Sequence, residues 1–282
     1  MKNVLSIAGS DSSGGAGIQA DLKTMCALGV YGMTVITAVT AQNTLSVDAV
    51  QEIDTEIVFA QIKAVFEDIP VDAVKIGMVS SASIIETVRA SLLRYKARNI
   101  VADPVMVSKS GCRLLRSEAI DALRSLCAIA DLVTPNIPEA ELLCGFPVQT
   151  DDDMRRAAQH IAEGGAKSVL IKGGHRAGAA AADLLYHEGR FSVFTTERIN
   201  TKNTHGTGCT LSSGIACRLA LGDPVEEAVR SAKAYLTEAL RLAEDLGHGA
   251  GPVAHLAALY GRGGYGVWGL GKEAPFDKAT VF

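Results

Sequence analysis

The chain has 282 residues, of which 48% are hydrophobic and 21% charged, with 27 Lys and Arg against 31 Asp and Glu. This composition is typical of a folded globular protein and excludes a disordered one. The net charge of −4 and the aromatic fraction of 5% argue against nucleic-acid binding, because phosphate-neutralising and base-stacking residues are both scarce. We therefore expect no nucleic-acid partner.

The chain contains six cysteines and six histidines. They form no C-x-x-C pair and no H-E-x-x-H motif, so a structural zinc site is not expected. The N-terminal apolar run over Val4–Ala8 is too short for a secretory signal. No stretch reaches the roughly 20 apolar residues of a membrane helix. We expect a cytoplasmic protein with no membrane partner.

Short apolar runs alternate with longer amphipathic segments along the chain. Strands are expected over Val4–Ala8, Met33–Thr40, Val47–Ile53, Ala73–Ile76, Asn99–Ala102, Leu132–Thr134 and Ser168–Ile171, with a hairpin over Asp183–Tyr186 and Phe191–Thr196. Helices are expected from the first glycine turn to Leu28, from an N-cap at Thr55 to about Asp68, and over Ser83–Lys96, Ser117–Ile129, Glu139–Leu143, Asp152–Glu163, Cys209–Leu219 and Val225–Leu246.

This alternation predicts an α/β fold with a mostly parallel sheet covered by helices on both faces. We expect one domain over residues 1–260 and a glycine-rich tail over residues 261–282 that includes Trp268 and Phe276. Ligands of such sheets bind beyond the carboxyl ends of the strands. Polar or glycine-rich motifs follow several predicted strands, and they are Gly9–Gly17, Gln42-Asn43, Gly77-Met78, Asp103, Asn136–Glu139 and Lys172–His175. One composite site is therefore predicted at this edge.

The first glycine loop is open to three interpretations. The run Gly15–Ala20 fits the dinucleotide fingerprint G-x-G-x-x-G/A between a strand and a helix. That fingerprint also needs an acidic residue at the end of the second strand, where this chain has Thr40–Asn43. A tight turn packed under the helix is a second interpretation. The third, which we favour, is a loop whose backbone approaches a substrate, flanked by Asp11 and Asp21.

The strongest functional signal is the segment Asn200–Ser212, which leads directly into an amphipathic helix. The amides of Gly206, Thr207, Gly208 and Cys209 would be unpaired donors at the positive end of the helix dipole. Such an end is suited to bind a phosphate. A thiol at this point is expected to have a lowered pKa and to accept a proton from a substrate hydroxyl. The alternative is that Cys209 is a small core residue.

The G-T-G-C motif at the start of a late helix resembles the anion hole of the ribokinase-like superfamily. Cysteine in its last position resembles the hydroxymethylpyrimidine/phosphomethylpyrimidine kinases of thiamine biosynthesis, whereas most sugar kinases of the superfamily carry Asp there. The resemblance covers about residues 2–260. Its further stretches are Ile7–Asp11, Ser13–Lys23, Thr40–Thr44, Lys75–Met78, Lys109–Gly111, Thr134–Ala140, Lys172–His175 and Thr201–Ser212.

The resemblance implies a ribokinase-like fold with a small β lid and a homodimer. It also implies a pyrimidine alcohol seated over the first glycine loop at Gly9. Gln42 would then pair with the pyrimidine ring, since an amide offers a donor and an acceptor side by side. Asp21 would lie near the hydroxymethyl group. Met78 and Val105 would supply apolar walls.

The resemblance also implies a nucleotide end of the site. Asn136 and Glu139 match the superfamily's N-x-x-E motif, which organises Mg²⁺ around the phosphates of ATP, and Asp103 would contribute in the same way. Lys172 would neutralise phosphate charge. His175 and His205 are not required as bases once Cys209 has that role.

The activity implied is transfer of the γ-phosphoryl group of ATP to 4-amino-5-hydroxymethyl-2-methylpyrimidine, and then to its monophosphate to give the diphosphate. A vitamin B6 kinase acting on pyridoxal or pyridoxine is the nearest alternative, because such kinases share the fold and a ring-bearing primary alcohol. An alternative of another class is a non-catalytic sensor that binds a pyrimidine or a nucleotide. A base beside an anion hole argues against the sensor.

Overall fold

The computed structural model describes residues 1–107, 111, 114–174 and 180–257. Lys109, Ser110, Cys112, His175 and the expected tail over residues 261–282 lie outside them, so the division into a domain and a tail stays a prediction. In the described part of the chain, no helix is long and apolar enough to cross a membrane.

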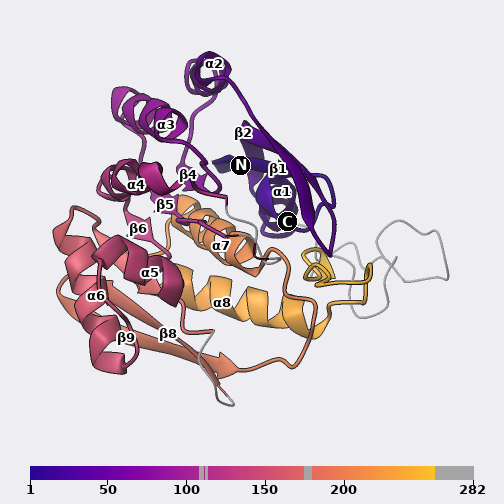
Figure 1. Ribbon diagram of the computed structural model, residues 1–282, viewed down its shortest axis with the longest axis vertical. Helices are drawn as coiled ribbons and strands as arrows, with labels where there is room; N and C mark the ends of the chain where they lie inside the picture. Colours follow the sequence, from indigo (N-terminus) through magenta and orange to yellow (C-terminus); the bar gives the residue numbers. More distant parts are fainter. Residues whose placement is uncertain (108–110, 112–113, 175–179, 258–282) are drawn as a thin grey trace.

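A single mixed sheet runs through the molecule (Figure 1). Its parallel centre has the order β2-β1-β4-β5-β6-β7. These strands are β1 (Asn3–Asp11), β2 (Tyr31–Gln42), β4 (Ala73–Ile76), β5 (Ile100–Ala102), β6 (Leu132–Val133) and β7 (Ser168–Ile171). β3 (Val47–Glu52) joins one edge antiparallel, and β8 (Ala180–His187) and β9 (Arg190–Glu197) join the other. Both antiparallel additions continue this sheet, so within the described residues the expected β lid is not a separate sheet.

Helices cover both faces of the sheet (Figure 1). One layer contains α2 (Thr55–Phe66), α3 (Ala82–Arg94), the 3₁₀ turn Ser117–Ala119 with α4 (Ile120–Cys127), α5 (Ile137–Cys144) and α6 (Asp151–Glu163). The opposite layer contains α1 (Gly17–Ala27), α7 (Thr207–Leu221) and α8 (Val225–Arg241). Each layer has its own apolar core against the sheet. The predicted α/β class and the mostly parallel sheet are confirmed.

The predicted helix boundaries differ from the observed ones by at most three residues, apart from the end of the last helix. Thr55 is the first residue of α2 and not its N-cap, a position that Asp54 occupies. The last helix ends at Arg241 and not at Leu246. The chain beyond it turns back because its backbone finds partners elsewhere: the amide of Ala250 donates to the Thr44 carbonyl, and the Gly251 carbonyl accepts from the amide of His205. Hydrogen bonds to distant parts of the chain thus replace the helical turn that the sequence pattern predicts after Arg241.

A buried cluster around Asp21 joins four elements. Asp21 on α1 and Lys75 on β4 are both fully buried, and the Lys75 ammonium lies 2.9 and 2.8 Å from the two carboxylate oxygens. The carboxylate also accepts from the hydroxyls of Ser6 on β1, at 2.5 Å, and Ser213 on α7, at 2.6 Å. Burial opposes the charge on Lys75, but the negative groups around it outweigh burial and hold its pKa above the usual value. The charged form of Lys75 is therefore part of the folded state.

Replacing Lys75 with Met should destabilise the protein by about 3–5 kcal/mol, because it leaves the Asp21 carboxylate buried without a counter-charge. Urea unfolding measures the loss. A matched control is Lys167→Met, since Lys167 pairs with Asp131 at 2.7 Å but is 74% exposed; it should cost less than about 1 kcal/mol. Equal losses in the two variants would contradict a stabilising role for the buried pair.

Candidate active site

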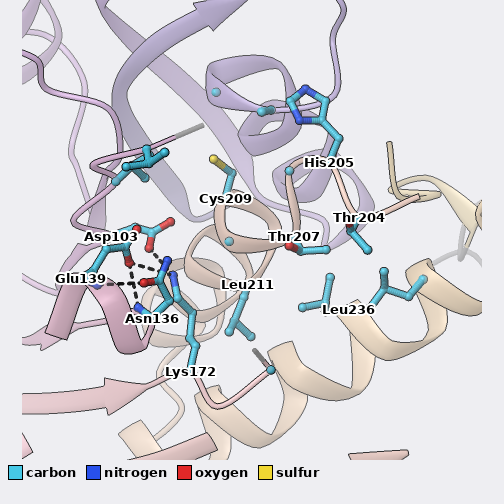
Figure 2. A pocket seen from close by; sticks show the side chains of 18 of the residues that line it. Asp103, Asn136, Glu139, Lys172, Thr204, His205, Thr207, Cys209, Leu211 and Leu236 are labelled. Atoms are coloured by element: carbon cyan, nitrogen blue, oxygen red, sulfur yellow. Dashed lines mark hydrogen bonds and ion pairs between the residues drawn. The ribbon is translucent and has the colours of Figure 1, made fainter. Parts of the chain in front are cut away.

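The predicted strand ends do converge on one cavity, with a volume of about 690 Å³. It lies beyond the carboxyl ends of β1, β4, β5, β6 and β7 and against the start of α7. The side chains that line it come from both halves of the chain, and they include Gln42, Met78, Asp103, Val105, Asn136, Glu139, Lys172, His205, Thr207, Cys209 and Leu236. Figure 2 shows Cys209 between the polar group of Asp103, Asn136, Glu139 and Lys172 and the side chain of His205.

Two glycine-containing loops interlock at the edge of the cavity. A Cβ on Gly206 would lie 1.8 Å from the carbonyl oxygen of Gly15, and Gly206 has a φ of +78°. A Cβ on Gly17 would lie 2.2 Å from the carbonyl oxygen of Gly9. At Gly9 the pairing of β1 with β2 also shifts register, as is common where a strand borders a site. The glycines are thus required by close backbone contacts, and they bring the first loop against the start of α7.

Asp11 holds the first loop in shape. One of its carboxylate oxygens accepts from the amide and the hydroxyl of Ser13, each at 2.8 Å. The other accepts from the amides of Gly15, at 3.1 Å, and Ala16, at 2.8 Å, and lies 2.8 Å from Nε2 of His205. Burial favours the neutral acid, but the hydrogen bonds from His205 and Ser13 prevail and hold the pKa of Asp11 below its usual value. The loop is therefore built around a carboxylate.

Cys209 lies in the first turn of α7 and lines the cavity. Burial raises the pKa of its thiol to about 11; the Lys75 ammonium lowers it, whereas Asp21 and Asp103 raise it further. The expectation of a lowered pKa is therefore wrong, because burial and the two carboxylates outweigh the Lys75 ammonium. The amide of Thr207 lies 3.4 Å from the Thr204 carbonyl, so it is not one of the free donors that the sequence predicted.

Asp103, Glu139 and Lys172 form a compact charged group. The Lys172 ammonium lies 2.6 Å from Asp103 and 3.9 Å from Glu139. Burial opposes the charge on Lys172, but the two carboxylates hold its pKa above the usual value. Burial raises the pKa of Glu139 to about 7, against the effect of Lys172. The ammonium of Lys172 is therefore a positive charge in the cavity wall, and Asp103 partly neutralises it.

Asn136 and Glu139 also form a capping box at the start of α5. The Asn136 side chain accepts from the Glu139 amide at 2.9 Å, and Glu139 accepts from the Asn136 amide at 2.8 Å. An N-x-x-E spacing at a helix start is sufficient to explain this arrangement. Both residues nevertheless line the cavity.

Four of the five residues expected to bind the substrate line the cavity. Gly9, Gln42, Met78 and Val105 all line the cavity, whereas Asp21 is fully buried in its cluster with Lys75. Asp21 therefore does not line the cavity, and its place near the hydroxymethyl group stays a prediction. An acid at the start of a helix is favoured by the dipole wherever it points, so the sequence alone does not separate a buried position from an exposed one.

Several residues of the cavity and its surroundings had no assigned role in the sequence analysis. Lys75, which is buried with Asp21 and does not line the cavity, carries a detectable signal, because a lysine inside a short apolar strand must be buried with a partner. His205, Leu236 and the buried pair of Asp183 and Lys233 had no such signal. Leu236 and Lys233 lie on α8, where apolar and basic residues are ordinary at a helical spacing.

Comparison with known proteins identifies the family. The profile of the phosphomethylpyrimidine kinase family matches residues 11–254. This chain belongs to that family. The hydroxymethylpyrimidine/phosphomethylpyrimidine kinase of Rhizobium meliloti is 52% identical over 255 residues, which cover 89% of this chain and 96% of the relative. The bifunctional thiamine biosynthesis protein ThiED of Geobacter sulfurreducens is 51% identical over 257 residues, and the chain spans only 52% of its length.

Solved structures agree with this assignment. The phosphomethylpyrimidine kinase of Clostridium difficile is 51% identical with a TM-score of 0.77, over 85% of this chain and 100% of that one. The pyridoxal kinase of Bacillus subtilis, solved with ADP, is 41% identical with a TM-score of 0.85, over 92% of this chain and 98% of that one. The ribokinase-like fold that the sequence implied is confirmed, and the chain is a phosphotransferase of this fold.

Gly206→Ala should greatly reduce turnover, because an added Cβ would push the start of α7 away from the first loop. Gly145→Ala is the matched control, since Gly145 has a φ of +82° but nothing within 4 Å of an added Cβ. It should cost only the backbone strain of about 1–2 kcal/mol. Turnover and melting temperature measured for both variants test this. Normal turnover in Gly206→Ala would refute the interlocking of the two loops.

Proposed function

We propose that the chain transfers the γ-phosphoryl group of ATP to 4-amino-5-hydroxymethyl-2-methylpyrimidine and then to its monophosphate. The family and the names of its relatives support this activity. The observation that carries it is the shared cavity: the amide of Gln42, the thiol of Cys209 and the ammonium of Lys172 all line one space. A ring, a hydroxymethyl group and a phosphate chain can be recognised there in that order.

At the substrate end, Gln42 is the polar group that recognises the pyrimidine edge. Gly9, Met78 and Val105 bound the same space with backbone and apolar surface. A fixed orientation of the ring directs the hydroxymethyl group toward Cys209, and such positioning supplies much of the rate in phosphoryl transfer.

At the nucleotide end, α7 and the charged group act on the phosphates. The amides of Gly208 and Cys209 and the helix dipole stabilise negative charge on the transferred phosphoryl oxygens. Lys172 adds a positive charge, and its contact with Asp103 orients the ammonium. The apolar side chains of Leu236 and Leu240 on α8 line the cavity as well and supply a wall for the nucleotide base.

The residues present fit a magnesium ion held mainly by phosphates. Among the described residues, no group of three or more His, Cys, Asp and Glu could hold a metal ion. Asp103 and Glu139 offer two carboxylates beside Lys172, and Mg²⁺ binds through one or two carboxylates together with phosphates and waters. When bound with ATP, the ion neutralises phosphate charge. Asp103 and Glu139 would hold it, and Glu139 would do so through a water.

Cys209 accepts the proton of the substrate hydroxyl. A thiol with a pKa of about 11 is a strong base once ionised, but little of it is ionised at neutral pH. A loose phosphoryl-transfer transition state tolerates this, because the attacking oxygen keeps its proton until late in the reaction. The proposal also includes the homodimer and the cytoplasmic location expected from the sequence.

The pH dependence of kcat/KM tests Cys209. In the wild type it should rise about tenfold per pH unit between pH 7 and 9, because the thiolate fraction grows toward the raised pKa. Cys209→Asp should remove this slope while keeping some turnover, since a carboxylate is a weaker base that is ionised throughout. Cys209→Ala should lose about 10²–10⁴-fold in turnover. Wild-type turnover in Cys209→Ala would exclude Cys209 as the proton acceptor.

The activity itself is tested with a panel of alcohols. ADP release is measured with ATP and the aminopyrimidine alcohol, its monophosphate, pyridoxal or pyridoxine. The two pyrimidines should be phosphorylated, and the aminopyrimidine alcohol should exceed pyridoxal by about tenfold or more in kcat/KM, which requires about 1.4 kcal/mol. A preference for pyridoxal would replace the proposal with a vitamin B6 kinase. Binding without turnover of any alcohol would support a sensor instead.

A further inference from the structure

The side chains around Gln42 form a chain of hydrogen-bonding groups that links the Asp11–His205 contact to the Gln42 amide. Nε2 of His205 lies 2.8 Å from the Asp11 carboxylate and 3.4 Å from the side-chain nitrogen of Gln42. At the other end of the amide, the hydroxyl of Thr40 lies 3.1 Å from the side-chain oxygen of Gln42 and 3.0 Å from the carbonyl of Ser10. Asp11, Thr40 and His205 are all buried.

The Asp11 carboxylate determines where the proton of His205 lies. Its pKa is held below the usual value, so at neutral pH it is ionised and can only accept. Nε2 of His205 must therefore carry a proton and donate it to Asp11. A nitrogen that donates cannot accept from the amide nitrogen of Gln42, so the group of Gln42 that faces it has to be an acceptor.

Turning the Gln42 amide by 180° about its last bond removes the donor–donor contact with His205. The oxygen of Gln42 then faces Nε2–H of His205, whose single proton it shares with the closer Asp11 carboxylate, and its nitrogen donates to the hydroxyl of Thr40. The single proton of Thr40 is left for the carbonyl of Ser10. In the opposite orientation, that proton would have two acceptors and the Gln42 nitrogen would meet a donor.

We propose that Asp11 and His205, with Thr40, are positioning residues that fix the orientation of the Gln42 amide and thereby determine substrate specificity. The inference rests on the proposed function. With the amide fixed, its acceptor side faces His205 and its donor side faces Thr40. A substrate edge is then recognised only if it presents a donor and an acceptor in the matching order. An exocyclic amine beside a ring nitrogen fits, whereas the phenolic oxygen of pyridoxal has only ring carbons on either side and offers no adjacent ring nitrogen to complete the pair.

The test is a double-mutant cycle on discrimination. The quantity measured is the ratio of kcat/KM for the aminopyrimidine alcohol to that for pyridoxal, in wild type, His205→Leu, Gln42→Leu and the double variant. General damage to the start of α7 would lower kcat/KM for both alcohols by the same factor, so it cancels in this ratio. His205→Leu should reduce the ratio about as much as Gln42→Leu does, roughly tenfold, and the double variant should show no further loss.

Two outcomes would overturn the positioning role. One is an unchanged ratio in His205→Leu, and the other is a double variant in which the reductions of the ratio from the two single variants multiply. His187→Leu is the matched control, because His187 on β8 contacts Ser168 on β7 and does not line the cavity. This variant should leave the ratio unchanged. If His205→Leu does not fold, Thr40→Val removes the other partner of the amide and should reduce the ratio to the same extent.

A measurement independent of turnover separates this inference from the proposed function. The ¹⁵N spectrum of histidine-labelled protein, with the His205 signals assigned by their loss in His205→Leu or His205→Gln, reports which ring nitrogens carry a proton. Nε2 should be protonated in the wild type. An unprotonated Nε2 would overturn the inference even if the kinase activity is confirmed, and a protonated Nε2 with no turnover of either alcohol would refute only the proposed function.

Discussion

The ion pair between Lys75 and Asp21 is the constraint on which the site depends. Both side chains are fully buried, and a buried charge is tolerated only with a partner and hydrogen bonds. The two serines that complete the cluster come from β1 and α7. The pair therefore fixes the position of α7 relative to the sheet, and Cys209 lies in the first turn of that helix. The electrostatic surroundings of the thiol are in part those of this cluster.

The second constraint is steric. Gly206 and Gly17 leave no room for a Cβ against the backbone of the first loop, so the two loops can approach closely enough for Asp11 to reach His205 at 2.8 Å. The segment after α8 secures the same region, because its carbonyl at Gly251 accepts from the amide of His205. Substrate wall, anion site and thiol are thus parts of one packed unit, although they come from opposite ends of the chain.

Much of this could be predicted from the sequence. The strands Ala73–Ile76 and Ser168–Ile171 were predicted with their observed bounds, because short apolar runs between turn residues are typical of buried parallel strands. The convergence of strand ends followed from the fold class. The end of α8 could not be predicted, since it depends on contacts with Thr44 and His205 far away in the chain. The thiol pKa could not either, because it depends on Lys75, Asp21 and Asp103 meeting around Cys209.

Burial keeps the Cys209 thiol protonated in the folded enzyme despite its place at a helix start. The most direct measurement is the rate of its alkylation by iodoacetamide against pH, followed by mass spectrometry of the peptide that contains Cys209, because only the thiolate reacts. With a pKa of about 11, the rate should rise about tenfold per pH unit from pH 7 to 10 without levelling. A rate that levels at or below about pH 9.5 would show a thiol of ordinary or lowered pKa, and burial would then not govern the protonation of Cys209.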